Sequence, residues 1–187
     1  MNEAGVASRE VWPLSLRLAH WLSAVLVLAA LGLGVAMVQF VHDPATRFEL
    51  TQTHKSIGVC ILALTVARLA RRGFSRAPKA EPLRRGLVLT AKAAHIALYV
   101  LLLVMPFSGW LMVTTTPVRV PTVIFGLYAL PYPLAPDLTI YRFAHATHVA
   151  LAVVLAALIA VHVAAAMVHA LAWRDRTFKR MWLKPTP

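Results

Sequence analysis

Acidic residues are scarce in this chain, which has 7 Asp and Glu against 19 Lys and Arg among 187 residues. None of the seven lies in the long apolar stretches described below. A proton relay through a membrane usually uses carboxylates within the membrane, so their absence argues against that class. The formal charge of +12 does not indicate a nucleic-acid partner, because the basic residues lie between apolar stretches, where membrane topology accounts for them.

Cysteine is nearly absent as well, since Cys60 is the one cysteine in the sequence. A single thiol excludes a disulfide within the chain. It also excludes covalent c-type haem attachment, which needs a C-x-x-C-H motif.

Apolar residues are abundant, at 59% of the chain with a mean hydropathy of +0.69. Four stretches, about residues 16–41, 52–70, 92–113 and 143–172, are long enough to cross a bilayer, which needs roughly 20 apolar residues. The sequence therefore predicts an all-α transmembrane four-helix bundle that forms one domain over residues 1–187. Lys55 and Arg68 lie near the two ends of the second span, where they can extend to the lipid headgroups.

The segments between the spans are expected to be irregular. Residues 42–53 are predicted to form a polar loop, and the proline-rich residues 114–141 an interfacial loop with a short amphipathic turn near 123–129. Of the 19 Lys and Arg, 15 lie in the N-terminal tail, the second loop and the C-terminal tail. Cytoplasmic segments carry the excess of Lys and Arg, so both termini are expected in the cytoplasm.

Residues 143–173 contain no charged side chain but hold four histidines: His145, His148, His162 and His169. An ionisable side chain within the membrane indicates function. His148 and His162 are 14 residues apart, which is about 21 Å along a helix and four turns less about 40°. They therefore share one face, near opposite membrane surfaces, as two stacked cofactors would require.

Two other histidines match these depths. His20 enters the first span from the cytoplasmic side, where His162 lies, and His54 enters the second span from the outer side, where His148 lies. Each pair can supply both axial ligands of one b-type haem, so the predicted metal ligands are these four imidazoles. Two imidazoles leave no open iron position, which suits electron transfer. His145 is the fallback for His148.

Other interpretations of these histidines remain open. A single histidine in a membrane is as often a hydrogen-bonded structural residue or an interfacial anchor as a ligand, although four at matched depths favour ligands. A catalytic zinc site would need three or four ligands at one depth. The two pairs lie about 21 Å apart and cannot share one metal.

The chain resembles the bacterial di-haem cytochrome b561 family of small four-helix membrane proteins. The matching motifs are spread over residues 12–184. They are Arg17-Leu-Ala-His20-Trp21, His54-Lys55-Ser-Ile-Gly58 with Val66-Ala-Arg68-Leu69, His95-Ile-Ala-Leu-Tyr99 with Met105-Pro-Phe-Ser-Gly109-Trp110, His148 with His162 and Ala164-Ala-Ala-Met-Val-His169, and the terminal segment Arg174-Asp-Arg-Thr-Phe-Lys-Arg180-Met181.

This resemblance implies electron transfer through two haems b between a quinone pool and a redox partner, in the inner membrane of a bacterium. Some relatives resemble a superoxide oxidase that passes electrons to ubiquinone. His95 and His169 are candidates to bind a quinone carbonyl or a haem propionate, and Lys55 a propionate. An interfacial histidine or a lysine that contacts only lipid headgroups is the alternative role for these three.

Two functional classes follow. In the first, the protein is an oxidoreductase that uses a diffusible donor such as superoxide. In the second, it is a haem b membrane anchor that carries electrons for a dehydrogenase or hydrogenase partner. Membrane lipid surrounds the protein in both.

Overall fold

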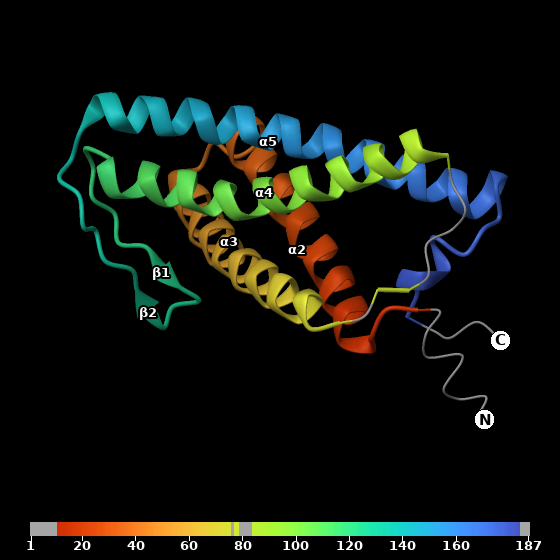
Figure 1. Ribbon diagram of the computed structural model, residues 1–187. Coiled ribbons are helices and arrows are strands. Elements are labelled where there is room, and N and C mark those ends of the chain that lie inside the picture. Colours follow the sequence, from red (N-terminus) through yellow and green to blue (C-terminus); the bar gives the residue numbers. More distant parts are fainter. Residues whose placement is uncertain (1–10, 76, 79–83, 184–187) are drawn as a thin grey trace.

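The computed structural model describes residues 11–75, 77–78 and 84–183. Four long helices dominate this part of the chain (Figure 1): α2 Leu14–Gln39, α3 Pro44–Gly73, α4 Arg85–Thr115 and α5 Leu138–Met167. Each is long and apolar enough to cross a membrane. The predicted all-α transmembrane four-helix bundle is therefore confirmed, while the cytoplasmic placement of the termini stays a prediction.

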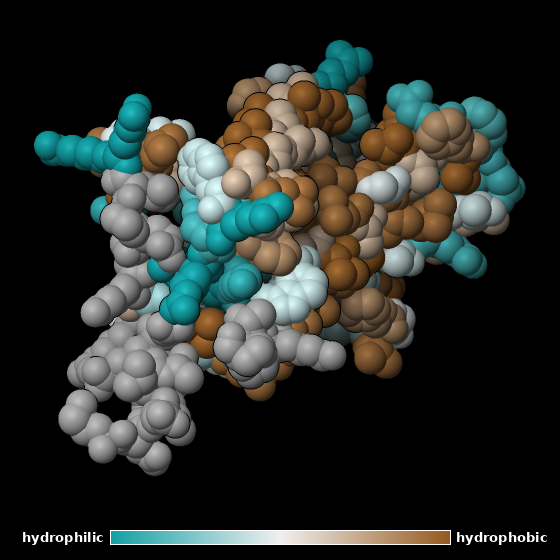
Figure 2. Space-filling model, turned by 90° about the vertical axis from the view of Figure 1, so that its right-hand side faces the viewer, coloured by the Kyte–Doolittle hydropathy of each residue, from teal (hydrophilic) through white to brown (hydrophobic). Residues whose placement is uncertain are grey.

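The helices pack as two neighbouring pairs, with α4 along α5 and α2 along α3, and α3 joins the pairs through α4 (Figure 1). Each helix contributes one aliphatic residue to a buried core: Val27, Ile61, Leu102 and Leu155. Large apolar side chains also cover the outside of all four helices. Figure 2, turned by 90° from Figure 1, shows hydrophobic side chains on the helices beside hydrophilic ones. Such an exterior suits contact with lipid chains rather than water.

All four helices begin before the predicted spans, and aspartates cap two of them, α3 and α5. α3 begins at Pro44, where the Asp43 carboxylate accepts a hydrogen bond from a backbone N–H of the first turn. α5 begins at Leu138, and Asp137 accepts two such bonds. An aspartate N-cap satisfies backbone donors that the helix itself leaves free, and proline suits the first helical position. The prediction of a loop over residues 42–53 is therefore wrong for most of its length.

The connection between α4 and α5 contains a β-hairpin, β1 Val123–Ile124 paired with β2 Tyr128–Ala129. The sequence predicted an amphipathic turn here, and the paired strands correct it. The bend between the strands has positive φ at Phe125 (48°) and Gly126 (73°), as tight hairpin turns require. The hairpin is held on α3, because the Phe125 N–H donates to the Ser56 hydroxyl over 3.0 Å.

Beyond α5 the chain forms a π-helical turn, Val168–Ala172, and a 3₁₀ turn, Lys179–Met181. Residues 179–183, here called the C-terminal strap, fold back onto the start of α2. Carbonyl oxygens of the strap accept hydrogen bonds from the Trp12 backbone N–H (3.2 Å), the Trp21 indole (2.8 Å) and the Arg17 guanidinium (2.7 Å). The strap therefore covers the end of the bundle where His20 lies.

Candidate functional site

A seven-residue spacing repeats on all four helices and divides the bundle into three layers. The middle layer is the aliphatic core. Seven residues before the core residues stand His20, His54, His95 and His148, and seven residues after them stand Gly34, Arg68, Gly109 and His162. Seven residues are nearly two full turns, so each set of three shares a helix face.

Because the helices alternate in direction, these positions gather in two end layers. One layer holds His20, Arg68, His95 and His162, and the other holds Gly34, His54, Gly109 and His148. The structure brings together the histidines that the sequence pairs by depth. The ring centroids of His20 and His162 lie 6.3 Å apart, and those of His54 and His148 lie 6.2 Å apart.

These two separations fit a metal shared by two imidazoles. A metal–imidazole nitrogen bond is about 2.0–2.1 Å, and a ring nitrogen lies about 1.1 Å from its ring centre, given ordinary bond lengths. Two rings on opposite sides of one metal therefore have centroids about 6.3 Å apart. Both pairs satisfy this test, while the role of these residues as haem ligands stays a prediction.

Hydrogen bonds at the His54–His148 pair engage the Nδ1 atoms and leave the Nε2 atoms free to bind a metal. The Nδ1–H of His54 donates to the Ala30 carbonyl oxygen over 3.0 Å. The Ser108 hydroxyl donates to the Met105 carbonyl over 2.7 Å, so the Nδ1–H of His148 donates to the Ser108 oxygen over 2.9 Å. Both Nε2 atoms keep their lone pairs, and such partners fix the tautomer and orientation of histidine ligands.

Two glycines make room for the same pair. A Cβ at Gly109 would lie 3.1 Å from the His148 Cε1 atom, and a Cβ at Gly34 would lie 3.7 Å from the His54 Cε1 atom. A larger residue at Gly109 would displace the imidazole. In the sequence Gly109 stands out only as part of the family motif, with no site role, although its spacing of 14 residues from His95 places both on one face of α4.

The His20–His162 end is more crowded with polar groups. Arg68 is 9% exposed, its guanidinium donates to His20 Nδ1 over 3.2 Å, and it lies 5.5 Å from the Tyr99 ring centre. The prediction that Arg68 extends to the headgroups is therefore wrong. The His95 ring lies 5.6 Å from that of His162, yet within the described residues no three metal-binding side chains converge on one point.

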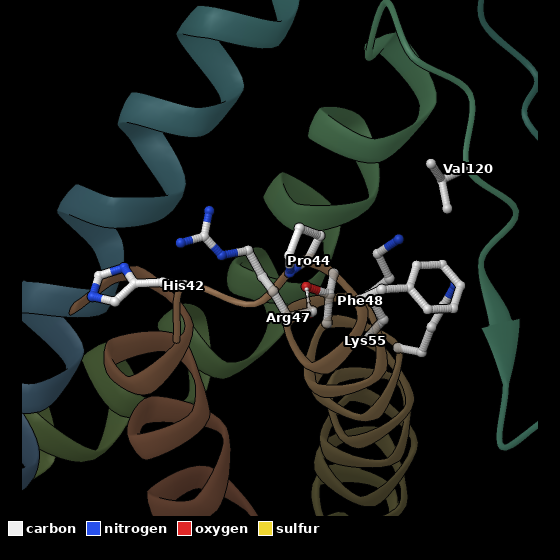
Figure 3. Close-up of a pocket in the computed structure, with 8 residues that line it drawn as sticks. His42, Pro44, Arg47, Phe48, Lys55 and Val120 are labelled. Atoms are coloured by element: carbon white, nitrogen blue, oxygen red, sulfur yellow. Dashed lines mark hydrogen bonds between the residues drawn. The ribbon is translucent and has the colours of Figure 1, made fainter. Parts of the chain in front are cut away.

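Lys55, a predicted propionate partner, lies at the other end. Its ammonium group donates to the Thr122 hydroxyl over 3.0 Å. Lys55 also lines a pocket of about 320 Å³ together with His42 and Arg47. In Figure 3, His42 and Arg47 lie on the opposite side of this pocket from Val120. The pocket thus has three basic side chains in a mixed polar and apolar lining, and one of them, Lys55, follows His54 in the chain.

His169 stands in the π-helical turn, where its Nδ1 lies 2.5 Å from the Asp175 carboxylate. Partial burial, the largest single influence, raises the pKa of Asp175, but hydrogen bonds from His169 and Thr177 outweigh it and hold the pKa below its usual value. His145, the fallback ligand, is exposed, and its ring lies 6.1 Å from that of Tyr141.

Known proteins are similar to this chain in sequence along nearly its whole length. The sequence model of the prokaryotic cytochrome b561 family matches residues 11–184. This chain belongs to the prokaryotic cytochrome b561 family. Cytochrome b561 homolog 2 of Escherichia coli (strain K12) is 34% identical over 163 residues, which cover 87% of this chain and 86% of that protein.

Family membership confirms the resemblance seen in the sequence. A cytochrome b561 is a membrane protein that binds haem b and transfers electrons. The four apolar helices agree with a multi-pass membrane protein.

Proposed function

We propose that this cytochrome b561 holds two haems b and passes electrons between a donor at the outer face and the quinone pool of the bacterial inner membrane. His20 and His162 would hold one haem, and His54 and His148 the other. The proposal is supported above all by the centroid separations of 6.3 Å and 6.2 Å at opposite ends of one bundle. Haem supplies one-electron chemistry when bound, while the protein fixes its ligands and surroundings.

From the distribution of Lys and Arg in the sequence, we expect the His54–His148 end at the outer face. The pocket beside it is lined by His42, Arg47 and Lys55. Basic groups around a hollow raise the local concentration of small anions. Superoxide is such an anion, so the favoured activity is that of a superoxide:ubiquinone oxidoreductase.

The quinone would then react at the opposite end, where His95 and His169 are available. His169 Nδ1 donates to the Asp175 carboxylate, so its Nε2 can donate to a quinone carbonyl only when the ring is an imidazolium paired with that carboxylate. Two superoxide ions each give up one electron, and one ubiquinone takes up two electrons and two protons. His169 and His95 are the proposed hydrogen-bonding groups for that quinone.

Stopped-flow spectroscopy of the purified protein with superoxide, with and without ubiquinone, tests this function. We expect superoxide to reduce the bound haem, and added ubiquinone to reoxidise it. Superoxide dismutase, added first, should abolish the signal and serves as the control. Haem that binds normally but is not reduced by superoxide would contradict the activity, and would favour the membrane-anchor class with a dehydrogenase or hydrogenase as donor.

A further inference from the structure

Arg68 is a buried cation for which the described part of the chain offers no acidic partner. Its exposed fraction is 9%, and the one ion pair between described residues joins His169 to Asp175. A buried charge is costly unless it is paired. Contacts with the His20 ring and the face of Tyr99 supply hydrogen bonding and a π-face but no negative charge.

The layer pattern shows that packing alone does not demand an arginine here. Arg68 stands seven residues after the core residue Ile61, as Gly34 stands seven residues after Val27. Arg68 and Gly34 thus occupy equivalent positions in the two end layers, next to His20 and His54 respectively. A glycine leaves space at one position, whereas a long cationic side chain fills the other.

The contact between Arg68 and His20 is incompatible with the usual ligand form of His20. A guanidinium only donates, so His20 Nδ1 is an acceptor here. A neutral histidine that ligates a metal through Nε2 carries its proton on Nδ1 and donates with it. Ligation by His20 therefore releases the guanidinium, which needs another acceptor nearby.

We propose that this acceptor is a propionate carboxylate of the haem held by His20 and His162, so that Arg68 is a positioning residue for that haem. The inference rests on the proposed function, and it deepens it by naming the group that holds the acidic side chain of the cofactor. Arginine and carboxylate form strong, often bidentate, hydrogen-bonded pairs.

Haem loss from the purified full-length holoprotein to excess apomyoglobin tests the pairing. Arg68→Gln should speed loss from the His20–His162 site about 10- to 100-fold, the range seen when the hydrogen-bonding partners of metal ligands are removed. Arg68→Lys should restore part of the retention, because it keeps the charge. Arg71→Gln is the matched control, since Arg71 is exposed on the same helix as Arg68 and contacts Ser75, just beyond the end of that helix. The rate of haem loss from the His54–His148 site should change by less than about twofold, which shows that the variant is folded.

Haem dimethyl ester, which lacks free carboxylates, separates carboxylate binding from an effect on His20. After exchange of haem for the ester, wild type and Arg68→Gln should lose it from the His20–His162 site at equal rates. If Arg68→Gln speeds loss of the ester as much as loss of haem, the pairing with propionate is contradicted. Unchanged haem loss in Arg68→Gln, with two haems bound, overturns this inference alone. A wild-type protein with fewer than two haems overturns the proposed function as well.

Discussion

His148 and His162 lie on one face of α5, and each imidazole is just over 6 Å from a histidine of a different helix, at 6.2 Å from His54 and 6.3 Å from His20. One helix therefore contributes to both candidate sites, while α2 and α3 each complete one. Leu155 lies midway between the two histidines and belongs to the buried core. This arrangement keeps the two sites apart by a layer of aliphatic side chains.

Replacement of Gly109 should damage the His54–His148 site selectively. An added Cβ would lie 3.1 Å from the His148 ring, and overpacking of this kind costs about 1–3 kcal/mol. We expect Gly109→Val to lower haem occupancy at that site and Gly109→Ala to do so less. The absorbance spectrum and the haem content of the purified variants measure the effect.

Gly58→Ala is the control for this prediction, because a Cβ at Gly58 meets nothing within 4 Å. It should keep both haems, since alanine is favoured over glycine in a helix by roughly 0.5–1 kcal/mol. Equal occupancy in Gly109→Val and Gly58→Ala would show that the space beside His148 is not required.

The histidine pairs could be predicted from their spacing in the sequence. Helical periodicity fixes the helix face on which each histidine lies, and the alternating direction of the spans fixes its depth in the membrane. The same arithmetic, carried over 14 residues from His54, would have placed Arg68 on the ligand face. Its charge instead indicated a side chain that extends to the headgroups, as a lone arginine at the end of a span often does. Its burial depends on Tyr99 and His20, which are distant in sequence.

The ends of the helices were less predictable. Asp43 and Asp137 are sequence signals for helix starts, but the polar residues that follow Asp43 resemble a loop when only hydropathy is considered. The hairpin at Val123–Ile124 and Tyr128–Ala129 and the C-terminal strap depend on hydrogen bonds to α3 and α2. Such long-range partners are not visible in the local sequence.

Charge at the outer face should control the rate of reduction by superoxide. Lys55 lines the pocket near this face, and Arg142 is exposed near the start of α5. Attraction of an anion by these two side chains weakens as salt screens it. Reduction should therefore slow as ionic strength rises, and charge reversal at either residue should slow it further. Arg142→Glu should do so without loss of haem, because no propionate is predicted to bind there. Arg71→Glu, at the opposite end of α3, should leave the rate unchanged. A rate independent of salt in stopped-flow measurements would contradict steering.

Reporter fusions test the orientation on which the faces depend. Fusions at Lys79, which lies outside the described residues, and after the C-terminus should report cytoplasm, and a fusion at Pro136 should report the outside, as the distribution of Lys and Arg predicts. An outside location for the Lys79 fusion would exchange the faces of the two sites and remove the argument for an outer electron donor at His54 and His148.

The Asp175 carboxylate should stabilise the protein in a pH-dependent way. Its pKa is lowered in the folded state, so its contribution is present above the unfolded value of about 3.9 and is lost as pH falls through the folded pKa. Asp175→Asn should lower the melting temperature at pH 7, and the difference from wild type should shrink below about pH 3.9. A difference that stays constant over this range would mean that the ionised carboxylate is not responsible.

The haem content of single-histidine variants tests the central claim most directly. Pyridine haemochrome analysis should give two haems per chain in wild type, with the low-spin spectrum of bis-histidine ligation. His20→Ala and His162→Ala should lose the same spectral component, and His54→Ala and His148→Ala the other, while the exposed His145→Ala should keep both. One haem per wild-type chain, or loss of one common component in all four variants, would contradict the two-site account.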